Sequence, residues 1–108
     1  MGTFELYRDK GENYRWRLRS GNHRTIADGG EGYSRKDDAL HGIELVRVQD
    51  GEFEVYQDAG GGHRWRLRAS NGRIFADSGE GYASRSNCAR AIRSVQRVAP
   101  VAQLDDKA

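Results

Sequence analysis

The feature that most constrains this chain is a repeat that runs without a gap. Shifting the sequence by 49 residues aligns Phe4–Val46 with Phe53–Val95. Twenty of the 45 positions that align between residues 4–48 and 53–97 are identical. A unit of about 45 residues rarely buries enough surface to fold alone. We therefore predict a tandem duplication whose two units share one core around a pseudo-twofold axis, so that a monomer contains an internal pseudo-dimer.

The hydrophobic pattern within each unit changes its period once. In the first unit, apolar and polar residues alternate over residues 4–7 and 14–19, and a third short stretch at 25–27 follows a turn signal. A period of two is typical of half-buried strands. Apolar residues then recur at helical spacing over residues 39–46. Each unit is therefore predicted to be β-β-β-α, which gives an α+β fold with antiparallel sheets packed on two helices.

Capping residues predict where the helices begin. Ser34 and Asp37 have the spacing of a capping box, so the first helix is expected to start near Ser34. In the second unit Ser84 is the better cap, and Pro100 ends the helix. The predicted organisation is a first repeat over residues 1–50, a second over 51–100 and a flexible tail over 101–108, with the two repeats folding as one cooperative domain.

The composition excludes several classes of protein. A single cysteine, Cys88, can form neither an internal disulfide nor a thiolate metal site. His23, His41 and His63 fall at positions that do not match between the units, so we predict no metal and no cofactor. No apolar stretch has the length of a membrane helix, and the first residues lack the pattern of a signal peptide. We therefore expect a cytoplasmic protein without a membrane partner.

Arginine is concentrated on one strand of each unit. Alternate residues of a strand share a face about 7 Å apart, so each strand is expected to carry three guanidinium groups in a row. These candidate binding residues are Arg15, Arg17, Arg19, Arg64, Arg66 and Arg68. In one interpretation they pair with carboxylates across the strands, namely Glu5, Glu54, Asp28 and Asp77. In the other they form a track for a polyanion, extended by Arg90, Arg93 and Arg97 of the second helix.

Aromatic residues are expected on both faces of the sheet. Trp16 and Trp65 alternate with arginine and share a face with leucine, so they are predicted to lie in the core. Tyr7 and Tyr56 alternate in the same phase as the glutamates of their strands. We therefore add the two tyrosines to the arginines as candidate binding residues on the polar face.

A glycine-rich loop with carboxylates follows the third strand of each unit. Its acidic residues are Asp28 and Glu31, and Asp77 and Glu80 in the second copy. Paired carboxylates of this kind can supply an acid and a base or bind a divalent cation. The structural alternative is that each aspartate accepts backbone N–H groups of its turn, with a positive φ at Gly32 and Gly81.

A family resemblance covers nearly the whole chain. In the first unit it is carried by Phe4, Tyr7, Trp16, Arg17, Leu18, Ala27, Asp28, Glu31, Gly32, Tyr33, Gly42 and Ile43. In the second it is carried by Phe53, Tyr56, Trp65, Arg66, Leu67, Ala76, Asp77, Ser78, Gly79, Glu80, Gly81, Tyr82 and Ile92. These motifs resemble the YegP-like family, also called the DUF1508 or UPF0339 domain. The resemblance implies a β-β-β-α unit that occurs singly or in tandem, and it implies no activity.

Three functional hypotheses follow from the sequence. The first is a non-enzymatic interaction module that binds a macromolecular partner, a protein, through the polar sheet face. The alternative is nucleic-acid binding without sequence specificity by the arginine-rich strands. A third is an enzyme or small-ligand protein that uses the carboxylate loops. The direction and pairing of the arginine side chains discriminate the first two, and a deep cleft at the loops favours the third.

Overall fold

The computed structural model describes residues 2–108 as seven strands, two α-helices and a short 3-10 turn. In chain order these are β1 (Thr3–Arg8), β2 (Tyr14–Arg19), β3 (Thr25–Asp28), α1 (Lys36–Val48), β4 (Glu52–Gln57), β5 (His63–Arg68), β6 (Ile74–Asp77), α2 (Arg85–Val98), η1 (Ala99–Val101) and β7 (Gln103–Asp106). The predicted β-β-β-α order of each unit is therefore confirmed.

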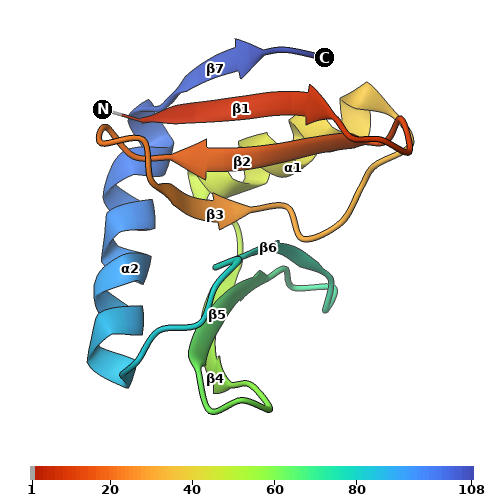
Figure 1. Ribbon diagram of the computed structural model, residues 1–108. Helices are drawn as coiled ribbons and strands as arrows, with labels where there is room; N and C mark the ends of the chain where they lie inside the picture. Colours follow the sequence, from red (N-terminus) through yellow and green to blue (C-terminus); the bar gives the residue numbers. More distant parts are fainter. Residues whose placement is uncertain (1) are drawn as a thin grey trace.

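All seven strands belong to one mixed sheet. Their order is β4-β5-β6-β3-β2-β1-β7, and each pair is antiparallel except β1 with β7, which is parallel. Apart from β7, the strands follow the same order outward from the contact between β6 and β3: the third, second and first strand of each unit. The two predicted antiparallel sheets are thus joined into one, through the single pair Asp28 and Asp77 (Figure 1).

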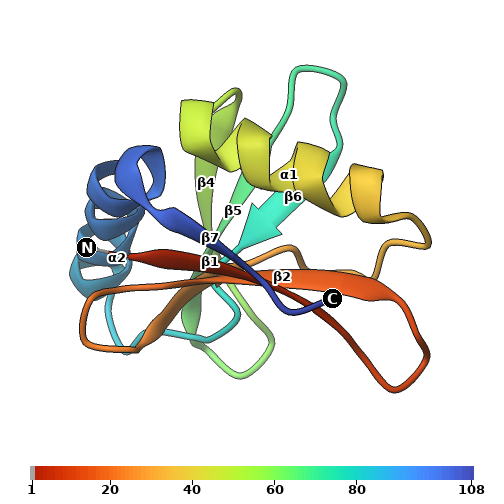
Figure 2. The same ribbon diagram turned by 90° about the horizontal axis from the view of Figure 1, so that it is seen from above.

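Each helix contacts strands of both units. Helix α1 packs on β1 and β2 of its own unit and on β6 of the other, and α2 packs on β4 and β5 and on β3 (Figure 2). Between them, Trp16 and Trp65 are at most 1% exposed and contact Phe4 and Phe53 edge to face, at centroid distances of 5.7 and 5.4 Å. The predicted placement of both tryptophans in a shared core is confirmed.

The start of the first helix differs from the prediction. The N-cap residue of α1 is Arg35, whose side chain makes no capping hydrogen bond, so the capping box at Ser34 was wrong. In α2, the Ser84 hydroxyl accepts a hydrogen bond from the Asn87 N–H at 3.1 Å, as expected. Arg35 and Ser84 are matching positions of the repeat, so the two helices start in register and Ser34 lies one residue too early.

The chain after Pro100 is also more regular than predicted. We expected a flexible tail over 101–108, whereas η1 returns the chain to the edge of β1 and residues 103–106 form β7. Ala102 is 4% exposed, and the Lys107 ammonium lies 2.9 Å from the Glu5 carboxylate. Within residues 103–106 only Leu104 is apolar, so this stretch carries no strand pattern and the neighbouring edge decides its conformation.

Candidate functional site

The arginine-rich strands form the centre of what we call the polar sheet face, the side of the sheet opposite the helices. It consists of the arginines of β2 and β5, Tyr7 and Tyr56, and the carboxylates Glu5, Glu54, Asp9, Asp58, Asp28 and Asp77. The Glu5 carboxylate is 2.5 Å from Arg17 Nε and 3.2 Å from Arg19 Nε. The Glu54 carboxylate is 2.9 Å from both Arg66 Nε and Arg68 Nε. Each glutamate thus holds two guanidinium groups of the neighbouring strand.

The remaining two arginines pair with residues that the sequence interpretation did not propose. Arg15 Nε lies 2.5 Å from Asp9, and Arg64 Nε lies 2.6 Å from Asp58. Each aspartate also accepts backbone N–H bonds within its hairpin turn, which fixes it in place. Both contacts lower the pKa of Asp9 and of Asp58, the arginine hydrogen bond most. Both copies of the repeat have aspartate at this position, and this match was the sequence signal that could have predicted Asp9 and Asp58 as partners of the arginines.

The two tyrosines of the polar sheet face lie under guanidinium groups. The Arg17 guanidinium is 4.8 Å from the centroid of the Tyr7 ring, and that of Arg66 is 4.6 Å from the centroid of Tyr56. Both tyrosines are half-buried rather than fully exposed. Cation-π contact and ion pairing therefore restrain Arg17 and Arg66 from two sides.

Glu5 and Glu54 occupy matching positions but differ in burial. The Glu5 side chain is 8% exposed and that of Glu54 is 36% exposed. Only at Glu5 does a third cation, Lys107 directly after β7, complete the cluster among the described residues. Hydrogen bonds from Lys107 and Arg17 outweigh the cost of burial and lower the pKa of Glu5 from 4.5 to about 2. The strand β7 thus distinguishes the two halves of the face.

Asp28 and Asp77 meet where the two halves join. Their Oδ1 atoms accept the N–H groups of Gly30 and Gly79, both at 2.8 Å, as the structural interpretation of the loops predicted. The two carboxyl groups form no ion pair with the strand arginines, so the interpretation that paired these arginines with Asp28 and Asp77 was wrong on this point. Burial, a hydrogen bond to Asp77 and the charge of Asp77 together raise the pKa of Asp28 from 3.8 to about 6. The pair therefore favours a state in which it holds one proton.

The glycines that allow this contact are not the predicted ones. Positive φ occurs at Gly30 (78°) and Gly79 (72°), not at Gly32 and Gly81. A Cβ on Gly30 would lie 2.6 Å from Asp77 Oδ2, and one on Gly79 would lie 2.6 Å from Asp28 Oδ2. Each aspartate therefore extends over the glycine of the other unit, and this crossing requires both the turn conformation and the missing side chain.

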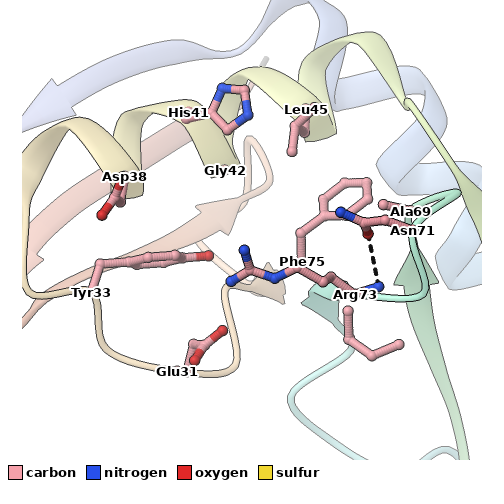
Figure 3. Close-up of a pocket in the computed structure, with 11 residues that line it drawn as sticks. Glu31, Tyr33, Asp38, His41, Gly42, Leu45, Ala69, Asn71, Arg73 and Phe75 are labelled. Atoms are coloured by element: carbon pink, nitrogen blue, oxygen red, sulfur yellow. Dashed lines mark hydrogen bonds between the residues drawn. The ribbon is translucent and has the colours of Figure 1, made fainter.

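The other loop carboxylates, Glu31 and Glu80, line two separate clefts. The first cleft, about 250 Å³, lies between the loop and α1 of the first unit and the β5-β6 turn of the second. Figure 3 shows the Arg73 side chain entering it towards Tyr33 and Glu31. The second cleft, about 730 Å³, lies between the loop and α2 of the second unit and the β2-β3 turn of the first. Every residue of the first cleft matches one of the second in the 49-residue repeat.

The two clefts are lined by matching positions of the repeat but differ in charge. Both contain one glutamate, one tyrosine and one arginine in matching places, with Arg73 in the first and Arg24 in the second. The first adds Asp38 and His41 on its helix, where the second has Asn87 and Arg90. The second also contains Arg97. Formal charges therefore sum to -1 in the first cleft, with His neutral, and to +2 in the second.

The comparisons with known proteins agree with the internal repeat. The model of the family DUF1508, described as a domain of unknown function, matches residues 9–56 and again residues 58–106. The chain belongs to the DUF1508 family. The two matches begin 49 residues apart, so each corresponds to one copy of the repeat, and the family resemblance seen in the motifs is confirmed.

This DUF1508 chain is similar to a protein with about the length of one unit and to solved structures with the same fold. A UPF0339 protein of Neisseria meningitidis serogroup B is 46% identical over 44 residues, which cover 41% of this chain and 77% of the relative. The solution structure of yegP from E. coli, a protein of unknown function, has a TM-score of 0.89 at 29% identity and covers 98% of this chain and 92% of that one. A UPF0339 protein from Shewanella oneidensis superposes with a TM-score of 0.87 at 24% identity, over 97% and 90% of the two chains.

Two further observations concern the described residues of this DUF1508 chain. Over residues 2–108, no helix is both long and apolar enough to cross a membrane. Within the same residues, no group of three or more histidine, cysteine, aspartate or glutamate side chains is arranged to hold a metal ion. Asp28 and Asp77 contact each other, while Glu31 and Glu80 open into different clefts, so the four loop carboxylates do not converge on one site.

Proposed function

We propose that the protein is a non-enzymatic interaction module that binds a protein partner through the polar sheet face. The observation that carries the proposal is the pairing of all six strand arginines with carboxylates. A face in which cations and anions nearly balance attracts a polyanion weakly, whereas it complements the mixed polar surface of a protein.

The restrained geometry of this face also supports the proposal. Arginine and tyrosine are among the residue types that are enriched in protein interfaces and their hot spots. Arg17 and Arg66 are already held by a glutamate and a tyrosine, so little side-chain entropy is lost when a partner docks. The pseudo-twofold arrangement gives two similar half-sites on either side of Asp28 and Asp77.

A photo-crosslinking amino acid at position 56 tests the proposal. In native lysate treated with nuclease, it is expected to give a saturable crosslink to protein. Adding Arg15→Gln, which lies on β2 in the other half of the face, should reduce that crosslink. The matched control places the same amino acid at Glu44, an exposed position of α1. Equal crosslinking from both positions, or loss of the crosslink on nuclease treatment, would contradict a protein site on the polar sheet face.

A second candidate function is binding of a polyanion such as nucleic acid in the second cleft. The observation that favours it is that Arg24, Arg90 and Arg97 make no ion pair among the described residues, unlike the strand arginines. If all three contact phosphates, the log-log slope of duplex affinity against salt is roughly -3, from about 0.9 per phosphate. Arg90→Gln with Arg97→Gln should flatten that slope, and Arg15→Gln with Arg64→Gln should leave it unchanged. Fluorescence anisotropy over a salt series makes this comparison.

A further inference from the structure

Strands β1 and β4 are equivalent in the repeat but have different neighbours. The parallel strand β7 lies along β1, in register from Thr3 with Gln103 to Leu6 with Asp106. Strand β4 lies at the other end of the sheet, with β5 on one side and no further strand on the other among residues 2–108 (Figure 1). The edge of β4 is thus the counterpart of the β1 edge, along which β7 of the same chain is paired.

Specific contacts hold β7 on β1, and each has a counterpart beside β4. Lys107 Nζ pairs with Glu5 Oε2 at 2.9 Å, and Lys36 Nζ at the start of α1 pairs with Asp106 Oδ2 at 2.6 Å. The residues at the matching positions are Glu54 and Arg85. Glu54 remains 36% exposed, and Arg85 is exposed and makes no ion pair within the described chain. Glu54, which binds two arginines but no third cation, and Arg85, which has no ion pair among the described residues, therefore lie where β7 would have its partners.

The apolar residues and the backbone of the two strands show the same difference. Phe4 and Leu6 are 0% exposed on β1, which has β7 beside it, whereas Phe53 and Val55 are only half-buried. On β1, the Gly2 and Leu6 carbonyls accept the N–H groups of Gln103 and Lys107 at 3.0 and 2.8 Å. An edge strand offers such groups unpaired, and an added strand satisfies them.

We propose that the free edge of β4 binds an extended segment of a partner protein, parallel to β4. The chemistry of that segment follows from β7: a small residue in the place of Ala102, then an acidic residue four positions later for Arg85, and a basic residue next to it for Glu54. This inference goes beyond the proposed function, because it concerns the edge of the sheet and not its polar face.

A segment of another protein fits this edge better than the β7 of a second copy. To donate β7, a copy would withdraw Lys107 from Glu5, whose carboxylate is 8% exposed and depends on its cations. It would also remove the strand that pairs with Phe4 and Leu6 of its own β1. The intramolecular β7 has no such cost, so β7 stays on β1 and the edge of β4 remains available.

The probe for this edge is a synthetic peptide of residues 100–108, added to the isotope-labelled full chain and followed by NMR. Saturable shifts are expected at the backbone amides of residues 53–55. Arg85→Glu should weaken the peptide affinity roughly fivefold, as loss of one partly exposed ion pair implies. A peptide with Asp106→Lys should bind Arg85→Glu better than the original peptide does. The matched control, Lys36→Glu, should leave the affinity at β4 unchanged.

Three results would overturn the inference. The first is that the β4 amides do not shift at millimolar peptide, or that the shifts occur at β1 alone, where the peptide would replace β7. The second is that Arg85→Glu and Lys36→Glu change the affinity equally. The third is that the β4 amides shift with protein concentration in the absence of peptide, which would mean that a second copy covers this edge. Failure of the crosslinking experiment on the polar sheet face would leave these outcomes unaffected.

Discussion

The carboxyl groups of Asp28 and Asp77 face each other at the one residue pair that joins β3 to β6. The pair lies at the junction between the two halves of the sheet, and it favours a state that holds one proton. Their contact depends on Gly30 and Gly79, over which they cross. The stability of the link between the two halves is therefore tied to pH and to these turns.

Asp28→Asn is expected to change how stability depends on pH. The folded state raises the pKa of Asp28 from 3.8 to about 6. The contribution of its proton to stability is full below about pH 4 and is lost as pH rises through about 6. Asn carries no charge at any pH, so the variant should be more stable than the native chain at pH 7, by about 1 kcal/mol, and this advantage should shrink towards pH 4.

Urea unfolding at several pH values between 4 and 7 measures this difference. Asp77→Asn serves as a second variant, because it removes the charge that raises the pKa of Asp28. Glu5 contributes a change only at the lower end of this window, since its lowered pKa means that its contribution is lost as pH falls from 4.5 through about 2. A native chain and an Asp28→Asn variant with parallel pH profiles would contradict a shared proton.

Gly30→Ala should destabilise the fold more than Gly72→Ala. Both glycines have positive φ, 78° and 86°, so alanine at either position costs about 1 kcal/mol in backbone conformation. A Cβ at Gly72 meets nothing within 4 Å, whereas one at Gly30 would lie 2.6 Å from the Asp77 carboxylate. We expect an additional loss of about 1 kcal/mol at Gly30, measured by chemical denaturation. Equal losses would mean that the Asp77 side chain moves away without cost.

Arg17→Gln and Arg66→Gln should have unequal effects, although the two arginines match in the repeat. Arg17 helps to neutralise Glu5, which is 8% exposed, so its loss should cost about 1 to 2 kcal/mol of unfolding free energy. Arg66 pairs with Glu54, which is 36% exposed, and its loss should cost less than about 1 kcal/mol. Denaturant midpoints of the two single variants test this order. The reverse order would show that burial of the glutamate does not set the strength of these pairs.

Residues 1–50 expressed alone should be largely unfolded or should dimerise, while the full chain unfolds in one cooperative step. The reason is that α1 packs on β6 and α2 packs on β3, so neither half contains a complete core. Sedimentation together with thermal melting distinguishes the outcomes. A monomeric first half with a sharp thermal transition would contradict the shared core.

The sequence predicted the fold well because its signals are periodic and occur twice. Trp16 and Leu18 alternate with arginine, so the strand and its buried face followed directly, and the matching Trp65 and Leu67 repeated the evidence. The strand β7 was missed because Gln103–Asp106 has no alternating apolar pattern and buries none of its four residues. Its conformation comes from pairing with the β1 edge and from the ion pair of Lys107 with Glu5, and both β1 and Glu5 are distant in sequence.

The site was predictable in its residues but not in its pairing. The arginines and tyrosines of the polar sheet face were identified from the alternation in β2 and β5. Which carboxylate each guanidinium meets depends on strand register and on turn geometry, as the contacts of Arg15 with Asp9 show. The meeting of Asp28 with Asp77 could not be derived, because it requires knowing that β3 and β6 are neighbours.

The exchange of helix contacts between the two units makes this chain a natural candidate for a split protein. A cut in the short connection at residues 49–51 would leave two fragments, each with a helix whose apolar surface is completed by the third strand of the other. The fragment from residue 52 onwards would also bring β7, which pairs with β1 of the first. Proteins fused to the two fragments would thus report their own association through the reassembly of one seven-stranded sheet.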